Sequence, residues 1–219
     1  MTDASETGAS GTSAPGTDTS ETSTSEASTP GADAPGTTEP GTTEPGTDAP
    51  GATEPERPEP PMTGDERVQL TGFLDFLRAS VVWKCSGLTD EQARRSLVPS
   101  ELTTVAGLLG HLTLVEAWWF RSVLDGQPDE WEERLKIDRD AEFRAAMETP
   151  MDQLIADYQA EIERCRAVVA ARGFDDTVTL PKGKEVSVRW VVVHMIEETA
   201  RHLGHLDLLR EMTDGRTGE

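Results

Sequence analysis

Apolar residues recur every three or four positions in four long stretches of the chain, which is the spacing of amphipathic helices. The first stretch covers about 65 to 84, with inward positions Leu70, Phe73, Leu74, Leu77 and Val81. The second covers about 103 to 124, with inward positions Leu108, Leu112, Val115, Trp119 and Val123. Glycine follows both stretches, at Gly87 and Gly126, and is typical of a helix end.

The third and fourth stretches have the same periodicity. The third runs from about 151 to 172, with inward positions Leu154, Tyr158, Ile162, Cys165 and Val169. The fourth runs to about Met212, with inward positions Val188, Val191, Met195, Leu206 and Leu209. Ser187 is the predicted N-cap of this last helix, because its hydroxyl can accept from a free backbone N–H of the first turn.

Shorter elements lie between these helices. The segment TDEQARRSL, residues 89–97, predicts a short helix, and DDTVTLPKGKEVSV, residues 175–188, is compatible with a small hairpin. Strand content is otherwise minimal. Four long helices with polar outer faces predict an all-α domain over residues 62–219, arranged as a four-helix bundle whose interior can hold a ligand or metal.

Residues 1–61 have a different composition and predict a disordered tail. Residues 1–60 contain no Val, Leu, Ile, Phe, Trp, Tyr or Cys, and a Pro-ended pentapeptide repeats from 31 to 55. Such a segment cannot bury enough apolar surface to offset its chain entropy. We therefore expect a solvated, acidic spacer in front of one folded domain.

The charge and the cysteine content of the chain indicate which partners and which cellular location to expect. The tail holds 12 of the 41 acidic residues, and the remaining 29 face 19 basic residues, so both parts are acidic. Nucleic acid and anionic membranes are therefore not expected partners. Cys85 and Cys165 form no metal-binding spacing and predict reduced, buried thiols. With no leader-like or membrane-spanning run, we expect a cytoplasmic protein, as a monomer or homodimer.

The segment HMIEETARHLGH, residues 194–205, holds three of the four histidines. At about 100° per residue, His194, Glu198, His202 and His205 project from one side of the helix, along the rim of its core-facing arc. Glu198 and His202 are one turn apart and can reach a common ligand.

The fourth histidine, His111, lies at the margin of the apolar stripe of the second helix. If the second and fourth helices are neighbours, His111, Glu198 and His202 can hold a divalent cation with an open coordination position. Two imidazoles and a carboxylate suit zinc, and less specifically nickel or ferrous iron. A thiol or water at the open position loses its proton near neutral pH.

Each of these residues also has a structural interpretation. His111 beside leucines is compatible with a hydrogen-bonded core histidine, and Glu198 with His202 is compatible with an ordinary pair on a wet helix face. His194 and His205 are interpreted as orienting the metal ligands, with structural packing equally compatible.

Two further features have open interpretations. Arg201 can anchor an anionic substrate or form a salt bridge with Glu197. The run Trp118, Trp119 and Phe120 fits the core better than a substrate platform. No nucleophilic or general acid residue is indicated, and the chain has no HExxH, GxSxG or phosphate-loop motif.

The segments GLLGHLTLVEAWWF, from residue 107, and VRWVVVHMIEETARHLGHLDLLRE, from residue 188, resemble a known family. This family is the DinB-like metal-binding four-helix bundles, in the branch that includes mycothiol-dependent maleylpyruvate isomerase, and the similarity covers about 64 to 212. The resemblance implies that His111, Glu198 and His202 bind zinc or nickel. It also implies chemistry with a low-molecular-weight thiol such as mycothiol or bacillithiol.

These observations lead to one functional hypothesis and one alternative. The hypothesis is a metal-dependent S-transferase or isomerase that joins a mycothiol-type thiol to small electrophiles, in detoxification. The alternative is a non-catalytic metal-binding helical bundle that acts in stress response or through protein partners.

Overall fold

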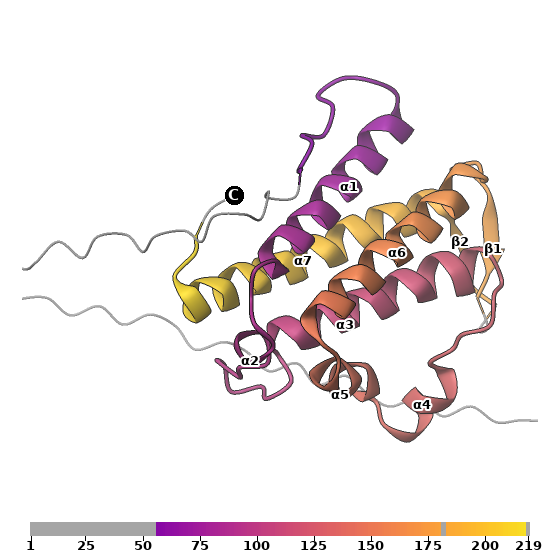
Figure 1. Ribbon diagram of the computed structural model, residues 1–219. Helices are drawn as coiled ribbons and strands as arrows, with labels where there is room; N and C mark the ends of the chain where they lie inside the picture. Colours follow the sequence, from indigo (N-terminus) through magenta and orange to yellow (C-terminus); the bar gives the residue numbers. More distant parts are fainter. Residues whose placement is uncertain (1–55, 181–182, 218–219) are drawn as a thin grey trace, which may run out of the picture. The chain divides into compact units, whose positions relative to one another are not determined.

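The computed structural model describes residues 56–180 and 183–217, and these are mostly helical, as predicted (Figure 1). The predicted tail lies outside the described residues as far as residue 55. In chain order the elements are α1 (Glu66–Cys85), α2 (Asp90–Ala93), α3 (Val105–Glu116), the π-helix η1 (Ala117–Leu124), α4 (Glu132–Ile137), α5 (Ala141–Glu148), α6 (Met151–Ala170), β1 (Thr177–Thr179), β2 (Glu185–Ser187) and α7 (Val188–Asp214).

The long helices contact one another around a shared apolar interior. Helix α1 packs along α7 and α6, and α3 packs against α5, α6 and α7 (Figure 1). All the inward positions predicted for α6 and α7 are buried. The mostly helical fold is thus confirmed, while the specific four-helix bundle stays a prediction. Within the described ranges, no helix combines the length and apolar character needed to cross a bilayer.

Polar side chains begin the helices where the sequence indicates. Ser187 Oγ accepts from the backbone N–H of Trp190 at 3.2 Å, as predicted, and Thr104 Oγ1 accepts from that of Gly107 at 2.9 Å. These bonds satisfy donors that the first turn leaves free. Gly215 ends α7 at φ +76°, where a residue with a Cβ would be strained.

The predicted short elements are present, and two helices were not predicted. Helix α2 begins with a capping box at Thr89, and β1 pairs antiparallel with β2. Helices α4 and α5 fill the segment before α6, where no long apolar period is visible in the sequence. Helix α5 approaches α3 closely at Gly110, where an added Cβ would lie 2.6 Å from the Cβ of Ala146.

The second predicted helix differs from its prediction in its second half. From Ala117 onward its backbone hydrogen bonds span five residues instead of four. Asp125 N, for example, donates to Phe120 O, five residues back, at 3.1 Å. Glu116, Phe120 and Leu124 are the fully buried positions, whereas the predicted Val115 and Val123 are only partly buried. Trp119 is buried as predicted, so the prediction was wrong at Val115 and Val123, where the next residue along is the buried one.

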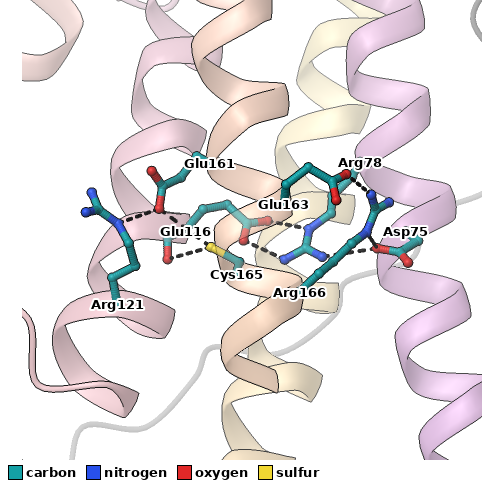
Figure 2. Close-up of polar contacts among 8 residues, drawn as sticks. All are labelled: Asp75, Arg78, Glu116, Arg121, Glu161, Glu163, Cys165 and Arg166. Carbon is teal, nitrogen blue, oxygen red and sulfur yellow. Dashed lines mark hydrogen bonds and ion pairs between the residues drawn. The ribbon is translucent and has the colours of Figure 1, made fainter. Parts of the chain in front are cut away.

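A charged network reaches into the interior at Arg78 and Glu116, where the sequence predicted only apolar contacts (Figure 2). Arg78 of α1 is buried, whereas Phe73, which was predicted to face inward, is 48% exposed. Arg78 donates to Glu116 of α3 through Nε at 2.7 Å and Nη2 at 2.6 Å. Burial alone would lower the pKa of Arg78, but Glu116 raises it by charge and hydrogen bonding. The guanidinium of Arg78 therefore stays charged despite its burial.

The two cysteines are free and buried, as predicted. Cys165 Sγ donates to the backbone oxygen of Glu116 at 3.6 Å (Figure 2). Burial raises the pKa of Cys85 to about 12, and burial and the Glu116 charge raise that of Cys165. Both thiols stay protonated near neutral pH and are packing residues rather than nucleophiles.

Residues just before α1 contact the folded part. The guanidinium of Arg57 lies 4.0 Å from the ring centroid of Trp83. Pro61 packs on α1 at Gly72, where a Cβ would lie 2.6 Å from Pro61 Cδ. These two residues, which the sequence analysis placed in the tail, therefore belong to the described fold.

Candidate metal centre

The three predicted ligands lie together between α3 and α7. His111 lies in the middle of α3, and Glu198 and His202 are one turn apart on α7. His111 Nε2 is 3.7 Å from Glu198 Oε1, and His202 Nε2 is 3.1 Å from the same oxygen. One donor atom from each residue lies within 4.8 Å of the others.

These distances fit a small divalent cation. Ligands at about 2.1 Å in tetrahedral geometry are about 3.4 Å apart, close to the two distances to Glu198. All three side chains are partly buried, between 14% and 21% exposed, so a ligand can still reach them. The arrangement supplies two nitrogens and one oxygen, a set that zinc accepts. Metal binding itself stays a prediction.

The ring of His111 is held by two residues of α5. Its Nδ1 lies 3.3 Å from Glu142 Oε1, and its face stacks on Phe143 at a centroid distance of 5.0 Å. A histidine that donates Nδ1–H to a carboxylate keeps the lone pair of Nε2 free. Here Nε2 is the nitrogen that faces Glu198.

Glu142 is a site residue that sequence reasoning missed. Its side chain is 7% exposed, and Oε2 has no hydrogen-bond partner among the described residues. It lies 31 positions from His111, in a helix without a long apolar period. The close approach of α5 to α3 at Gly110 brings it to the centre, and one sequence alone gives no signal for that contact.

His202 is poised to remain neutral. Burial lowers its pKa, nearby His111 lowers it further, and Glu198 opposes both effects. A neutral imidazole is the form that binds metals. His205, the next histidine along α7, places Nδ1 3.4 Å from His202 Nδ1, so it is in position to orient the ring.

The structure does not bring His194 into this cluster. His194 stacks on Trp190 at a centroid distance of 4.9 Å and meets Trp119 edge-on at 4.9 Å. Arg201 pairs with Glu197, one of the two roles predicted for it, and its Nη1 lies 3.7 Å from Glu198 Oε2. It is 58% exposed at the edge of the centre.

A mostly helical fold in which two imidazoles and a carboxylate meet between α3 and α7 agrees with the DinB-like resemblance of the sequence. The chain belongs to the mycothiol S-transferase family, because the family model described as mycothiol-S-transferase matches residues 69–215. That range includes every residue of the candidate centre. Comparison with curated proteins and with solved structures finds no match.

Proposed function

We propose that this protein is a metal-dependent mycothiol S-transferase that acts on small electrophiles, and that His111, Glu198 and His202 hold its divalent cation. The convergence of three donor atoms within 4.8 Å, in a chain of this family, is the observation that carries the proposal. Zinc fits the donor set best, and nickel and ferrous iron also fit. The bound cation would lower the pKa of a thiol that coordinates it, so that thiolate forms near neutral pH.

The protein's own residues prepare this centre for a thiol. Glu142 accepts the Nδ1 proton of His111 and leaves Nε2 available. His205 orients His202, and burial keeps His202 in the neutral form. Phe143 covers one face of the His111 ring and limits water there. Arg201, exposed beside Glu198, can attract an anionic group of a substrate.

Metal content tests the ligand assignment. Purified full-length protein should bind one divalent ion per chain, and His202→Ala should lose it. His194→Ala is the matched control, because this histidine lies on the same helix but contacts tryptophans instead of the ligands. Full metal retention in His202→Ala would refute the assignment.

Turnover tests the reaction. We expect metal-loaded protein to accelerate adduct formation between mycothiol and an electrophile, measured by chromatography of the thioether. Glu198→Gln should abolish the acceleration, and Glu197→Gln, a change of the exposed neighbouring carboxylate, should preserve it. Metal-loaded protein without any acceleration would favour a non-catalytic binding role instead.

A further inference from the structure

Four aromatic rings form a second cluster, on α7 and on η1, the π-helix that continues α3. Trp118 meets Trp119 edge-on at a centroid distance of 4.5 Å, and Trp119 lies 5.3 Å from Trp190. His194 contacts both Trp119 and Trp190 at 4.9 Å. We call Trp118, Trp119, Trp190 and His194 the aromatic cluster.

Part of this cluster is open to solvent. Trp118 is 36% exposed and Trp190 48% exposed, whereas the adjacent Phe120 is completely buried in the core. Exposure of tryptophan is unfavourable in free energy, because each indole presents a large apolar face to water. Trp118 and Trp119 also lie in the π-helix, a form that is rare and frequently found at functional sites.

The aromatic cluster lies next to the candidate metal centre. On α7, Trp190, His194, Glu198 and His202 follow one another at four-residue steps, which form a single ridge of the helix. At 1.5 Å per residue, His194 is about 6 Å and Trp190 about 12 Å along the axis from Glu198.

The facing segment has the matching order. His111 contacts Glu198 and His202, and Trp119, eight positions further on, contacts Trp190 and His194. The two segments therefore run antiparallel, with the metal centre and the aromatic cluster about two turns apart. A molecule that reacts at the centre can reach the aromatic cluster with its remaining part.

Charge indicates what kind of molecule fits. Glu197 Oε2 lies 3.7 Å from His194 Nδ1, but Glu197 is already paired with Arg201. The aromatic cluster therefore presents ring faces beside a compensated charge pair. Flat neutral rings stack well on such faces, whereas an ammonium group would gain most from an uncompensated carboxylate nearby.

We propose that the aromatic cluster is the binding subsite for planar aromatic electrophiles, whose reactive carbon is then presented to the thiol at the metal centre. The presentation of the reactive carbon to the thiol rests on the proposed function, whereas the binding of the ring does not. With 1-chloro-2,4-dinitrobenzene, the thiolate sulfur bonds to the ring carbon that carries chlorine. Chloride leaves with the electron pair of the broken C–Cl bond, and the thiol proton passes to solvent.

Binding of an unreactive analogue tests the subsite without any chemistry. Equilibrium dialysis of full-length protein with 2,4-dinitroaniline should show saturable binding that Trp118→Ala or Trp190→Ala weakens about three- to tenfold. Trp118→Phe keeps an aromatic face and should largely restore binding, and circular dichroism checks that each variant is folded.

The matched control is Trp131→Ala, since Trp131 lines a separate cavity of about 260 Å³ between α3, α5 and α6. It should bind like the unsubstituted protein. Absence of binding, equal binding in all variants, or a loss confined to Trp131→Ala would overturn the proposal. So would a change of sedimenting mass in Trp118→Ala, which would make the aromatic cluster a contact between copies.

Kinetics separate this proposal from the proposed function. For metal-loaded protein with mycothiol, Trp118→Ala should lower kcat/KM for chlorodinitrobenzene several-fold and leave that for iodoacetamide, which has no ring, unchanged. An equal loss for both electrophiles would overturn electrophile recognition by the aromatic cluster. If neither electrophile is turned over but dinitroaniline binding still depends on Trp118, the proposed function fails and the ring-binding subsite stands.

Discussion

The buried pair of Arg78 and Glu116 offers the sharpest test of the fold. Arg78 is 3% and Glu116 0% exposed, and two hydrogen bonds of 2.7 and 2.6 Å join them (Figure 2). Removing one partner of a buried ion pair costs about 3–5 kcal/mol, because the other charge remains desolvated. The two single substitutions should differ within this range, since their remaining contacts differ.

Glu116→Gln should cost about 3 kcal/mol, because Arg78 keeps an ion pair with Asp75 at 3.1 Å. Arg78→Met should cost about 4–5 kcal/mol, because Glu116 is fully buried and Tyr158 and Cys165 beside it bring no positive charge. Arg78→Met with Glu116→Leu removes both charges and should stay within about 1 kcal/mol of the unsubstituted protein.

Urea unfolding at pH 7, followed by circular dichroism on metal-free protein, measures all three variants. With unchanged m, the free energies follow from the midpoints, and a 3 kcal/mol loss corresponds to a fall in Tm of about 6–12 °C. A cost below about 1 kcal/mol for Arg78→Met would refute the reasoning. A double variant as unstable as the single ones would show that packing, not charge, dominates this position.

Four further outcomes are expected. Glu142→Leu should weaken metal binding about 10- to 100-fold in competition with a chelating dye, and Glu142→Gln, which can still accept from His111, should weaken it less; equal effects would contradict this. In metal-free protein the pKa of His202 is lower in the folded than in the unfolded state. The free energy of unfolding should therefore be highest above about pH 6.5 and fall as the pH is lowered, because the unfolded state takes up the proton first. His202→Gln should therefore flatten the fall of the urea midpoint between pH 7 and pH 5. Tyr158→Phe removes a buried hydroxyl without a hydrogen-bond partner among the described residues and should cost less than about 1 kcal/mol, so a loss above 2 would be inconsistent. Deleting residues 1–55 should leave the calorimetric Tm unchanged, given their composition.

Regular apolar periodicity made α6 and α7 predictable. Each has apolar residues on one face near both ends, and Ser187 marks where α7 begins, so the inward face of α7 followed from sequence alone. Because Glu198 and His202 lie along the rim of that face, the sequence also predicted where their side chains point. His111 could be added because its helix has a stripe of its own in the first half.

Features that depend on partners distant in sequence were not predictable. A charged residue such as Arg78 or Glu116, considered alone, indicates a solvated position. Both are buried only because they pair with each other across 38 residues of the chain. Glu142 reaches His111 because α5 packs on α3 at Gly110. The π-helix was missed because spacings of three and four residues do not distinguish i→i+4 from i→i+5 hydrogen bonding over a short segment.

The widened turn of residues 117–124 also determines how this segment tolerates a change in chain length. A π-helical turn holds about one residue more than an α-helical turn, so loss of one amino acid here can be absorbed by a return to i→i+4 hydrogen bonding. In the regular α-helix α6, the same loss would rotate the positions on one side of it by about 100° relative to those on the other side. A one-residue deletion should therefore be better tolerated in η1 than in the middle of α6.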